Sequence, residues 1–164
     1  MKKRINVLYL TIALAMIVAA LGAISVGAFG GNTPSANGQG SINEPLGLRT
    51  FSFSAITKKD GSVTGQATLH RRATTLFFAK VDVNCLNIVG NTATVSGVVT
   101  NSSNPEAIGL VALFRVTDNG EGQGNTSDQI SLLYFDAPDS GTDCRITEFI
   151  PQVPIEGGNI QVKP

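Results

Sequence analysis

Alternation of hydrophobic and polar residues dominates the chain after residue 48, and it is clearest over residues 77–100. Within that stretch, residues 79–85 and 92–99 alternate with a period of two, which is typical of strands buried on one side. Gly90 and Asn91 lie between the two runs, and both residue types suit the centre of a two-residue hairpin turn. The pattern therefore predicts a long β-hairpin in the middle of an antiparallel sheet.

The hairpin contains a break in its alternation. Ile88, next to the turn, has an even number, whereas the apolar residues Val81 and Val83 further along the same arm have odd numbers. One extra residue at Cys85 and Leu86, a β-bulge, would return all of them to one face and bring Val83 opposite Gly97. The alternative is an arm that is apolar on both faces because other parts of the chain cover each side.

Shorter alternating runs continue along the rest of the chain. They predict strands at residues 51–55, 63–69, 108–117 and 129–135, a short strand at 144–149 and a final edge strand at 159–162. Charged residues make up 15% of the chain and there are 18 glycines, which also favours strands and turns. The predicted fold class is all-β: an antiparallel meander of seven to eight strands that forms a sandwich or a closed barrel.

The first 28 residues have the organisation of a signal peptide. Lys2, Lys3 and Arg4 precede an apolar run that extends to Phe29, and small residues at its end suit cleavage after Ala28. The run is also long enough to cross a bilayer as one N-terminal hydrophobic helix, so an uncleaved membrane anchor is the alternative. Both interpretations place the rest of the chain outside the cytoplasm, either secreted or at the cell surface, or on a single-pass anchor with the domain outside.

Two further segments complete the predicted organisation. Residues 29–48 are rich in Gly, Asn, Ser and Pro and contain few bulky apolar residues, which predicts a flexible linker. Residues 49–164 carry the alternating runs and are predicted to be the all-β domain.

The charges of the chain balance to zero, with 12 basic and 12 acidic residues. A nucleic-acid-binding protein usually has a basic stripe, so no nucleic-acid partner is expected. Contact with a membrane is expected only through the N-terminal segment if it is retained, and the partner is expected to be an unidentified extracellular one. Between Val116 and Cys144 there are six acids and no lysine or arginine, which predicts that one end of the domain is acidic.

The two cysteines, Cys85 and Cys144, are predicted to form a disulfide. Cysteines of exported domains are more often paired than free. Closing a loop of this length contributes about 4 kcal/mol in the chain-entropy model. The alternative is two separate buried thiols, and two cysteines with a single histidine are too few for a zinc site.

The loop at residues 118–128 is the strongest candidate for a functional site. Asp118, Asn119, Glu121 and Asp128 supply carboxylate and amide oxygens, which are the ligands that calcium prefers. The spacing differs from that of an EF-hand. The competing and favoured interpretation is a solvated hairpin loop in which Asp118 and Asp128 accept hydrogen bonds from backbone amides, because Asp, Asn and Gly are common in turns.

His70 is the single histidine, and it stands beside Arg71 and Arg72. A general base needs a nucleophile and an orienting acid, and the chain has no G-x-S-x-G motif to supply the first. A surface position at the end of a strand is the favoured interpretation. Together with Lys80 these residues also suggest a weak basic patch, for which solvated charges are the simpler explanation.

Several of these segments together resemble one family. The residues that carry the resemblance are Cys85, Leu86, Gly90, Asn91 and Ala93 in the hairpin, Asp118, Asn119, Gly120, Gly122 and Asp128 around the acidic loop, and Gly158, Asn159, Ile160 and Val162 near the C-terminus. In this order they are similar to the small secreted bacterial all-β domains labelled post-COAP domains, over residues 50–163. Ile88 stands where that family usually has Val. The resemblance implies an exported all-β module without an established activity, and it assigns no catalytic residue.

Two function classes follow from these observations. The first is an exported, non-catalytic structural or interaction module of unknown ligand, stabilised by one disulfide. The alternative is a small-ligand-binding barrel or a hydrolase that acts outside the cytoplasm. No catalytic residue and no cofactor other than calcium is predicted, so the chain is not expected to be an enzyme. A deep pocket lined by converging polar side chains would favour the alternative, and a packed apolar interior would favour the first class.

Overall fold

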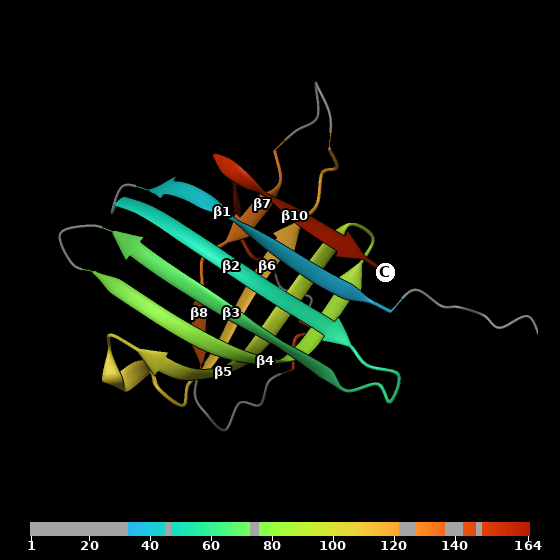
Figure 1. Ribbon diagram of the computed structural model, residues 1–164, viewed down its shortest axis with the longest axis horizontal. Coiled ribbons are helices and arrows are strands. Elements are labelled where there is room, and N and C mark those ends of the chain that lie inside the picture. Colours follow the sequence, from blue (N-terminus) through green and yellow to red (C-terminus); the bar gives the residue numbers. More distant parts are fainter. Residues whose placement is uncertain (1–32, 45–46, 73–75, 122–126, 137–142, 147–148) are drawn as a thin grey trace, which may run out of the picture. The chain divides into compact units, whose positions relative to one another are not determined.

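A computed structural model describes residues 33–44, 47–72, 76–121, 127–136, 143–146 and 149–164. Within these ranges ten strands form one antiparallel sheet (Figure 1). The strands are β1 (Ser35–Glu44), β2 (Gly47–Thr57), β3 (Val63–Arg72), β4 (Phe77–Val89), β5 (Thr92–Ser102), β6 (Val111–Thr117), β7 (Gln129–Ser131), β8 (Tyr134–Asp136), β9 (Gln152–Pro154) and β10 (Gly157–Lys163). The helical element among the described residues is one 3-10 turn, η1 (Pro105–Ala107). The predicted signal peptide and its hydrophobic helix lie outside the described residues.

The order of strands across the sheet is β10-β1-β2-β3-β4-β5-β6-β7-β9, and β8 pairs with the part of β6 that β7 leaves uncovered. Strands β1 to β7 are therefore neighbours in space in the order in which they follow along the chain, which confirms the predicted all-β antiparallel meander. The sheet curls into a half-barrel (Figure 1). Among the described residues β9 and β10 end the sheet and do not pair with each other, so the ladder of strand pairing stays open. The prediction of seven to eight strands was too low.

The central hairpin is formed by β4 and β5, and its predicted register is confirmed. Ile88 pairs with Ala93 and Val83 pairs with Gly97, as the alternation requires. The register shifts between Val83 and Cys85, so the extra residue of the predicted bulge is Asn84, one position earlier than expected. The turn places Gly90 at φ 62°, the positive φ that the first central residue of a type II′ turn requires.

The predicted flexible linker is the main error of the sequence analysis. Ser35–Glu44 forms β1, which lies between β2 and β10 and pairs with both. A Cβ added at Gly38 would lie 2.8 Å from Cε1 of Phe53. One at Gly40 would lie 3.0 Å from Cζ of Phe51. The nearest atom to the added Cβ of Gly40 is the backbone carbonyl oxygen of Gly157. The glycines that suggested a spacer are therefore required because the phenylalanine rings and the backbone of β10 both lie close to this strand.

Three strand boundaries also differ from prediction. Residues 108–110 precede β6, and the predicted strand at 129–135 is divided between β7 and β8. Residues 144–146 and 149 are not in a strand, so the predicted strand at 144–149 was wrong. The prediction that one end of the domain is acidic was also wrong. Asp136 lies opposite Val111, the first residue of β6, whereas Asp118 directly follows the last residue of the same strand. The two acids are therefore at opposite ends of β6.

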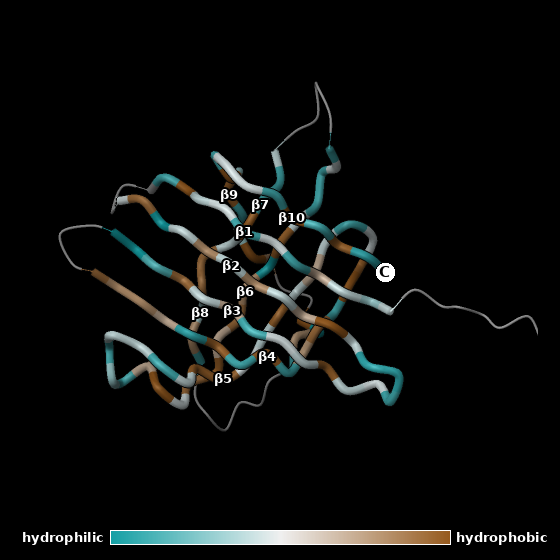
Figure 2. The backbone as a smooth tube through the Cα atoms, viewed as in Figure 1, coloured by the Kyte–Doolittle hydropathy of each residue, from teal (hydrophilic) through white to brown (hydrophobic). Residues whose placement is uncertain are grey.

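The hydrophobic core lies inside the curl of the sheet. Side chains from β1 to β7 and β10 meet there, and the rings of Phe53 and Phe114 are in edge-to-face contact with centroids 5.3 Å apart. Figure 2 shows how hydrophobic and hydrophilic residues alternate along the strands. Outside the curl, Cys144 and Ile150 are buried as well, so another segment of the chain covers part of the outer face.

Candidate functional site

The described residues of the loop predicted as a cation site, 118–121 and 127–128, lie beside the end strand β10, and residues 122–126 are outside the described ranges. The carboxylate of Asp128 is 5% exposed and accepts two backbone hydrogen bonds. Its Oδ1 accepts from the N–H of Asn119 at 2.9 Å, and its Oδ2 accepts from the N–H of Ile160 at 2.7 Å. One carboxylate thus connects the loop that precedes β7 with a strand more than 30 residues later in the chain.

The carboxylate of Asp118 also accepts two backbone hydrogen bonds, and its contact with β10 lies two residues further along that strand. Its Oδ1 accepts from the N–H of Gly120 at 2.8 Å, and its Oδ2 accepts from the N–H of Val162 at 2.9 Å. We refer to Asp118 and Asp128 as the seam carboxylates, because they belong to the β6–β7 connection and bind the edge of β10.

The seam carboxylates take the place that a neighbouring strand would otherwise occupy. Successive backbone N–H groups of a strand point to opposite edges, so alternate residues of β10 direct theirs away from β1. Ile160 and Val162 are such residues, and each donates to a carboxylate. Hydrogen bonds to charged acceptors are stronger than those between neutral groups, so two side chains satisfy this stretch of edge.

The other two residues of the predicted cation site lie at the same seam. Oε1 of Glu121 accepts from Nδ2 of Asn159 at 3.1 Å and from Nε2 of Gln161 at 3.3 Å. Nδ2 of Asn119 donates to the carbonyl of Ser127 at 2.8 Å. In the part of the chain that the structure describes, no group of three His, Cys, Asp or Glu residues is placed to hold a metal ion. Calcium binding by this loop stays a prediction.

The predicted disulfide between Cys85 and Cys144 is present, with a Cα–Cα distance of 5.9 Å. The bulge at Asn84 reverses the alternation of β4, so that Cys85 faces outward while Val83 faces the core. Cys144 is buried, and its N–H donates to Sγ of Cys85 at 3.1 Å. The disulfide therefore holds the segment around Cys144 against the outer face of β4 and β5.

Polar side chains on the outer face are buried and engaged in hydrogen bonds. Thr94 and Ser96 are both buried there. Arg115 lies among them and donates from Nε to Oγ1 of Thr94 at 3.1 Å and from its guanidinium to the carbonyl of Ile146 at 3.3 Å. A groove of about 460 Å³ lies beside this region and is lined by Val111, Leu113, Tyr134, Phe135, Asp136, Asp143, Ile146, Phe149, Ile150 and Pro151.

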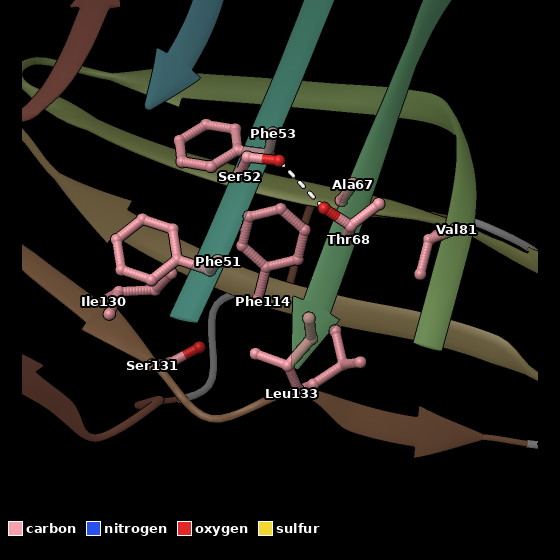
Figure 3. A pocket seen from close by; sticks show the side chains of 11 residues that line it. Phe51, Ser52, Phe53, Ala67, Thr68, Val81, Phe114, Ile130, Ser131 and Leu133 are labelled. Carbon is pink, nitrogen blue, oxygen red and sulfur yellow. Dashed lines mark hydrogen bonds between the residues drawn. The ribbon is translucent and has the colours of Figure 1, made fainter. Parts of the chain in front are cut away.

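The cavity inside the half-barrel is small and apolar. It has a volume of about 30 Å³, and Figure 3 shows the rings of Phe51, Phe53 and Phe114 gathered around it. The polar residues at its border are satisfied: the hydroxyls of Ser52 and Thr68 share a hydrogen bond of 2.8 Å (Figure 3). The third such hydroxyl, that of Ser131, donates to the carbonyl of Leu132 at 2.8 Å. No polar group of this described lining is left to orient a ligand in the interior.

The predicted basic patch is divided between the two faces of the sheet. His70 lies on the outer face, exposed, with its ring 4.8 Å from that of Phe78. Arg72 has the same parity as His70 and is exposed too. Arg71 has the opposite parity and shares the inner face with Leu69 and Ala67.

A second cavity, which the sequence analysis missed, lies beside Arg71. It has a volume of about 200 Å³ and is lined by Arg49, Leu69, Arg71, Phe77, Leu133 and Phe135. The sequence contained a signal for this cavity. Arg49 and Arg71 stand at positions of the alternation that face inward, where the other residues of their strands are apolar. Parity does not reveal which strands are neighbours, so it could not place the two arginines together.

Comparison with known proteins adds no relative. No family model, no curated protein and no solved structure matches the chain. The resemblance to post-COAP domains therefore stays a prediction.

One further finding concerns membranes. None of the helices in the part of the chain that the structure describes is long and apolar enough to span a bilayer.

Proposed function

We propose that the protein is an exported, non-catalytic interaction module whose contacts with a partner lie on its surface and at the rims of the half-barrel. The observation that carries this proposal is the Cys85–Cys144 disulfide, which joins an outer covering segment to the central hairpin. Disulfides persist in oxidising compartments and are rare in the cytoplasm of mesophiles. The apolar N-terminal run supports export as a signal peptide or as a retained anchor.

The interior of the sheet supports a module in preference to an internal carrier or a hydrolase. Ligand pockets of drug-sized molecules have volumes of about 300–1,000 Å³. The interior cavity of about 30 Å³ is far smaller and is lined mainly by Phe51, Phe53, Phe114 and other apolar side chains. The post-COAP resemblance also favours a module without catalysis, and calcium is the cation proposed for the oxygens of Asp118, Asn119, Glu121 and Asp128.

Intact mass spectrometry of the full-length chain, expressed in a bacterial host and recovered by fractionation, tests the proposal. We expect the protein in an extracytoplasmic fraction, cleaved after Ala28 and lacking the two hydrogens that disulfide formation removes. A full-length mass with the disulfide formed, found in the membrane fraction, would support the retained anchor and still support export. The variant with serine at Cys85 and Cys144 is the control for the mass assignment. A cytoplasmic protein with both thiols reduced would overturn the proposal.

A further inference from the structure

The outer face of β1, β2 and β3 is a broad polar surface that carries no charge at its centre. The residues that point outward have the parity opposite to that of the buried Ala36, Phe53 and Ala67. The central outward positions are Asn37 and Gln39 of β1, Thr50, Ser52 and Ser54 of β2, and Gln66 and Thr68 of β3. A soluble surface typically carries about 25–35% charged residues, so an uncharged area of this size points to a specific partner.

The strand register arranges these side chains in rows across the sheet. In one row Ser52 and Thr68 lie opposite each other, and their hydroxyls share a hydrogen bond of 2.8 Å (Figure 3). In the neighbouring row Ser54 lies between Asn37 and Gln66. No hydrogen bond within the described part of the chain engages these last three side chains. Amide and hydroxyl groups both donate and accept, so this row offers donors and acceptors to a ligand.

An aromatic pair lies at one end of the polar area. His70 is the next outward residue of β3 after Thr68, and it pairs with Phe78 of β4. The centroids of the two rings are 4.8 Å apart, and His70 is exposed whereas Phe78 is half-buried. The rings add a flat apolar surface to the hydrogen-bonding row. From Gln66 to His70 the combined track extends for about 13 Å along β3.

The chemistry of this surface selects among macromolecular partners. A charged partner would lose solvation without meeting an opposite charge, which is unfavourable. The core of a protein interface is apolar, whereas the central positions of this area have no bulky apolar side chain. A nucleic acid would require basic residues for its phosphates. A neutral polysaccharide fits both parts of the surface, because it combines many hydroxyl groups with the apolar C–H faces of its sugar rings.

We propose that the outer face of β2 and β3 binds an extended, uncharged polysaccharide. The amide of Gln66 and the hydroxyl of Ser54 exchange hydrogen bonds with sugar hydroxyls, and the ring of His70 packs against the C–H face of a sugar. Because the track follows the direction of the strands, the polysaccharide must be straight, as β-1,4-linked chains are. This inference rests on the proposed interaction module and names the class of its partner.

The test is a titration of the full-length, oxidised protein with cellohexaose and separately with chitohexaose, followed by isothermal calorimetry and by NMR of the backbone amides. We expect saturable binding of at least one of them, with shifts concentrated at β2, β3 and the start of β4. Gln66→Ala should bind roughly 3- to 10-fold more weakly, because a hydrogen bond between neutral groups is lost. His70→Ala should also weaken binding, and His70→Phe should restore it because it restores an aromatic ring.

The chain offers a matched control in Gln129→Ala. This variant removes the same amide from β7, which β4, β5 and β6 separate from β3 in the strand order. It should bind as the wild type does, and circular dichroism would verify that all variants are folded. Maltohexaose, whose α-linked chain is curved, should bind at least about ten-fold more weakly than the extended probes. Absence of binding of both extended probes, unchanged affinity of Gln66→Ala and His70→Ala, or equal binding of maltohexaose would overturn the inference.

This test can fail separately from the test of export. A protein that is exported with its disulfide formed and binds neither extended probe would overturn the polysaccharide site and leave the proposed interaction module intact. A cytoplasmic protein with both thiols reduced would overturn the proposed function, whichever sugar it binds.

Discussion

Asp128→Asn changes one oxygen of a seam carboxylate into an amide nitrogen and leaves the shape of the side chain almost unchanged. In the wild type the two oxygens accept from Asn119 and Ile160 at 2.9 and 2.7 Å. In the variant one of these backbone N–H groups must face an NH2 group, whichever way the amide is turned. The substitution therefore removes one charge-assisted hydrogen bond at a site that is 5% exposed.

The expected effect follows from the strength of such a bond. Hydrogen bonds to charged groups contribute about 1.5–3 kcal/mol, so the free energy of unfolding should fall by about 2 kcal/mol. For a domain of this size that loss corresponds to a decrease in melting temperature of roughly 6–10 °C. The amide of Ile160 should also exchange its hydrogen faster than in the wild type, because the edge of β10 loses an acceptor.

Urea denaturation of the oxidised protein, followed by circular dichroism, measures the change. Asp82→Asn is the matched control, since Asp82 is an exposed aspartate on the outer face of β4. It should change the free energy of unfolding by less than about 0.5 kcal/mol. If Asp128→Asn were no less stable than Asp82→Asn, the idea that a carboxylate holds β10 at the seam would be wrong.

Three further predictions concern other parts of the fold. Replacing both cysteines by serine should lower the free energy of unfolding by about 4 kcal/mol in urea denaturation, because the unfolded chain regains the entropy of a long loop. A fall of less than about 1 kcal/mol would argue that the disulfide is dispensable. Gly38→Ala should lower the free energy of unfolding by about 1–3 kcal/mol through overpacking, whereas Gly157→Ala should have little effect because its Cβ would have only one neighbour within 4 Å, at 3.8 Å. Equal stability of these two variants would contradict the packing argument for β1. The pKa of Asp60 is lowered chiefly by the hydrogen bond from the Ser62 hydroxyl and then by the Ser62 N–H. Its ionised form therefore favours the folded state above the ordinary carboxyl pKa of about 3.9, and this preference is lost as pH falls through the lowered value. In Ser62→Ala an NMR titration should show the pKa of Asp60 closer to that ordinary value, and an unchanged pKa would contradict the assignment.

The seam has a consequence for association between molecules. A strand at the end of a sheet presents unpaired N–H and C=O groups that can recruit another chain. On β10 the N–H groups of Ile160 and Val162 are engaged by the seam carboxylates, which removes two donors from this edge. Variants that lose these carboxylates should therefore be examined for association as well as for stability.

Much of the hairpin could be predicted from local sequence. The alternation in β4 and β5, the Gly90 turn and the parity break that requires a bulge all lie within one short stretch, so the pairing of Val83 with Gly97 followed directly. The disulfide was predictable because the chain has only two cysteines and an apparent export segment. In each of these cases the physical cause is either local in sequence or leaves a single choice of partner.

Tertiary structure decided the rest, because it depends on which distant segments become neighbours. Ser35–Glu44 has a single bulky apolar residue, Ile42, and is a strand because β2 and β10 lie on either side and pack closely against its glycines. Asp128 was expected in a turn, but that it accepts from Ile160 required β10 to return beside β1. Parity placed Arg71 on the inner face, and only the pairing of β2 with β3 placed Arg49 beside it. Alternation records which side of a strand a residue faces, whereas the identity of the neighbouring strand is set by packing of the whole sheet.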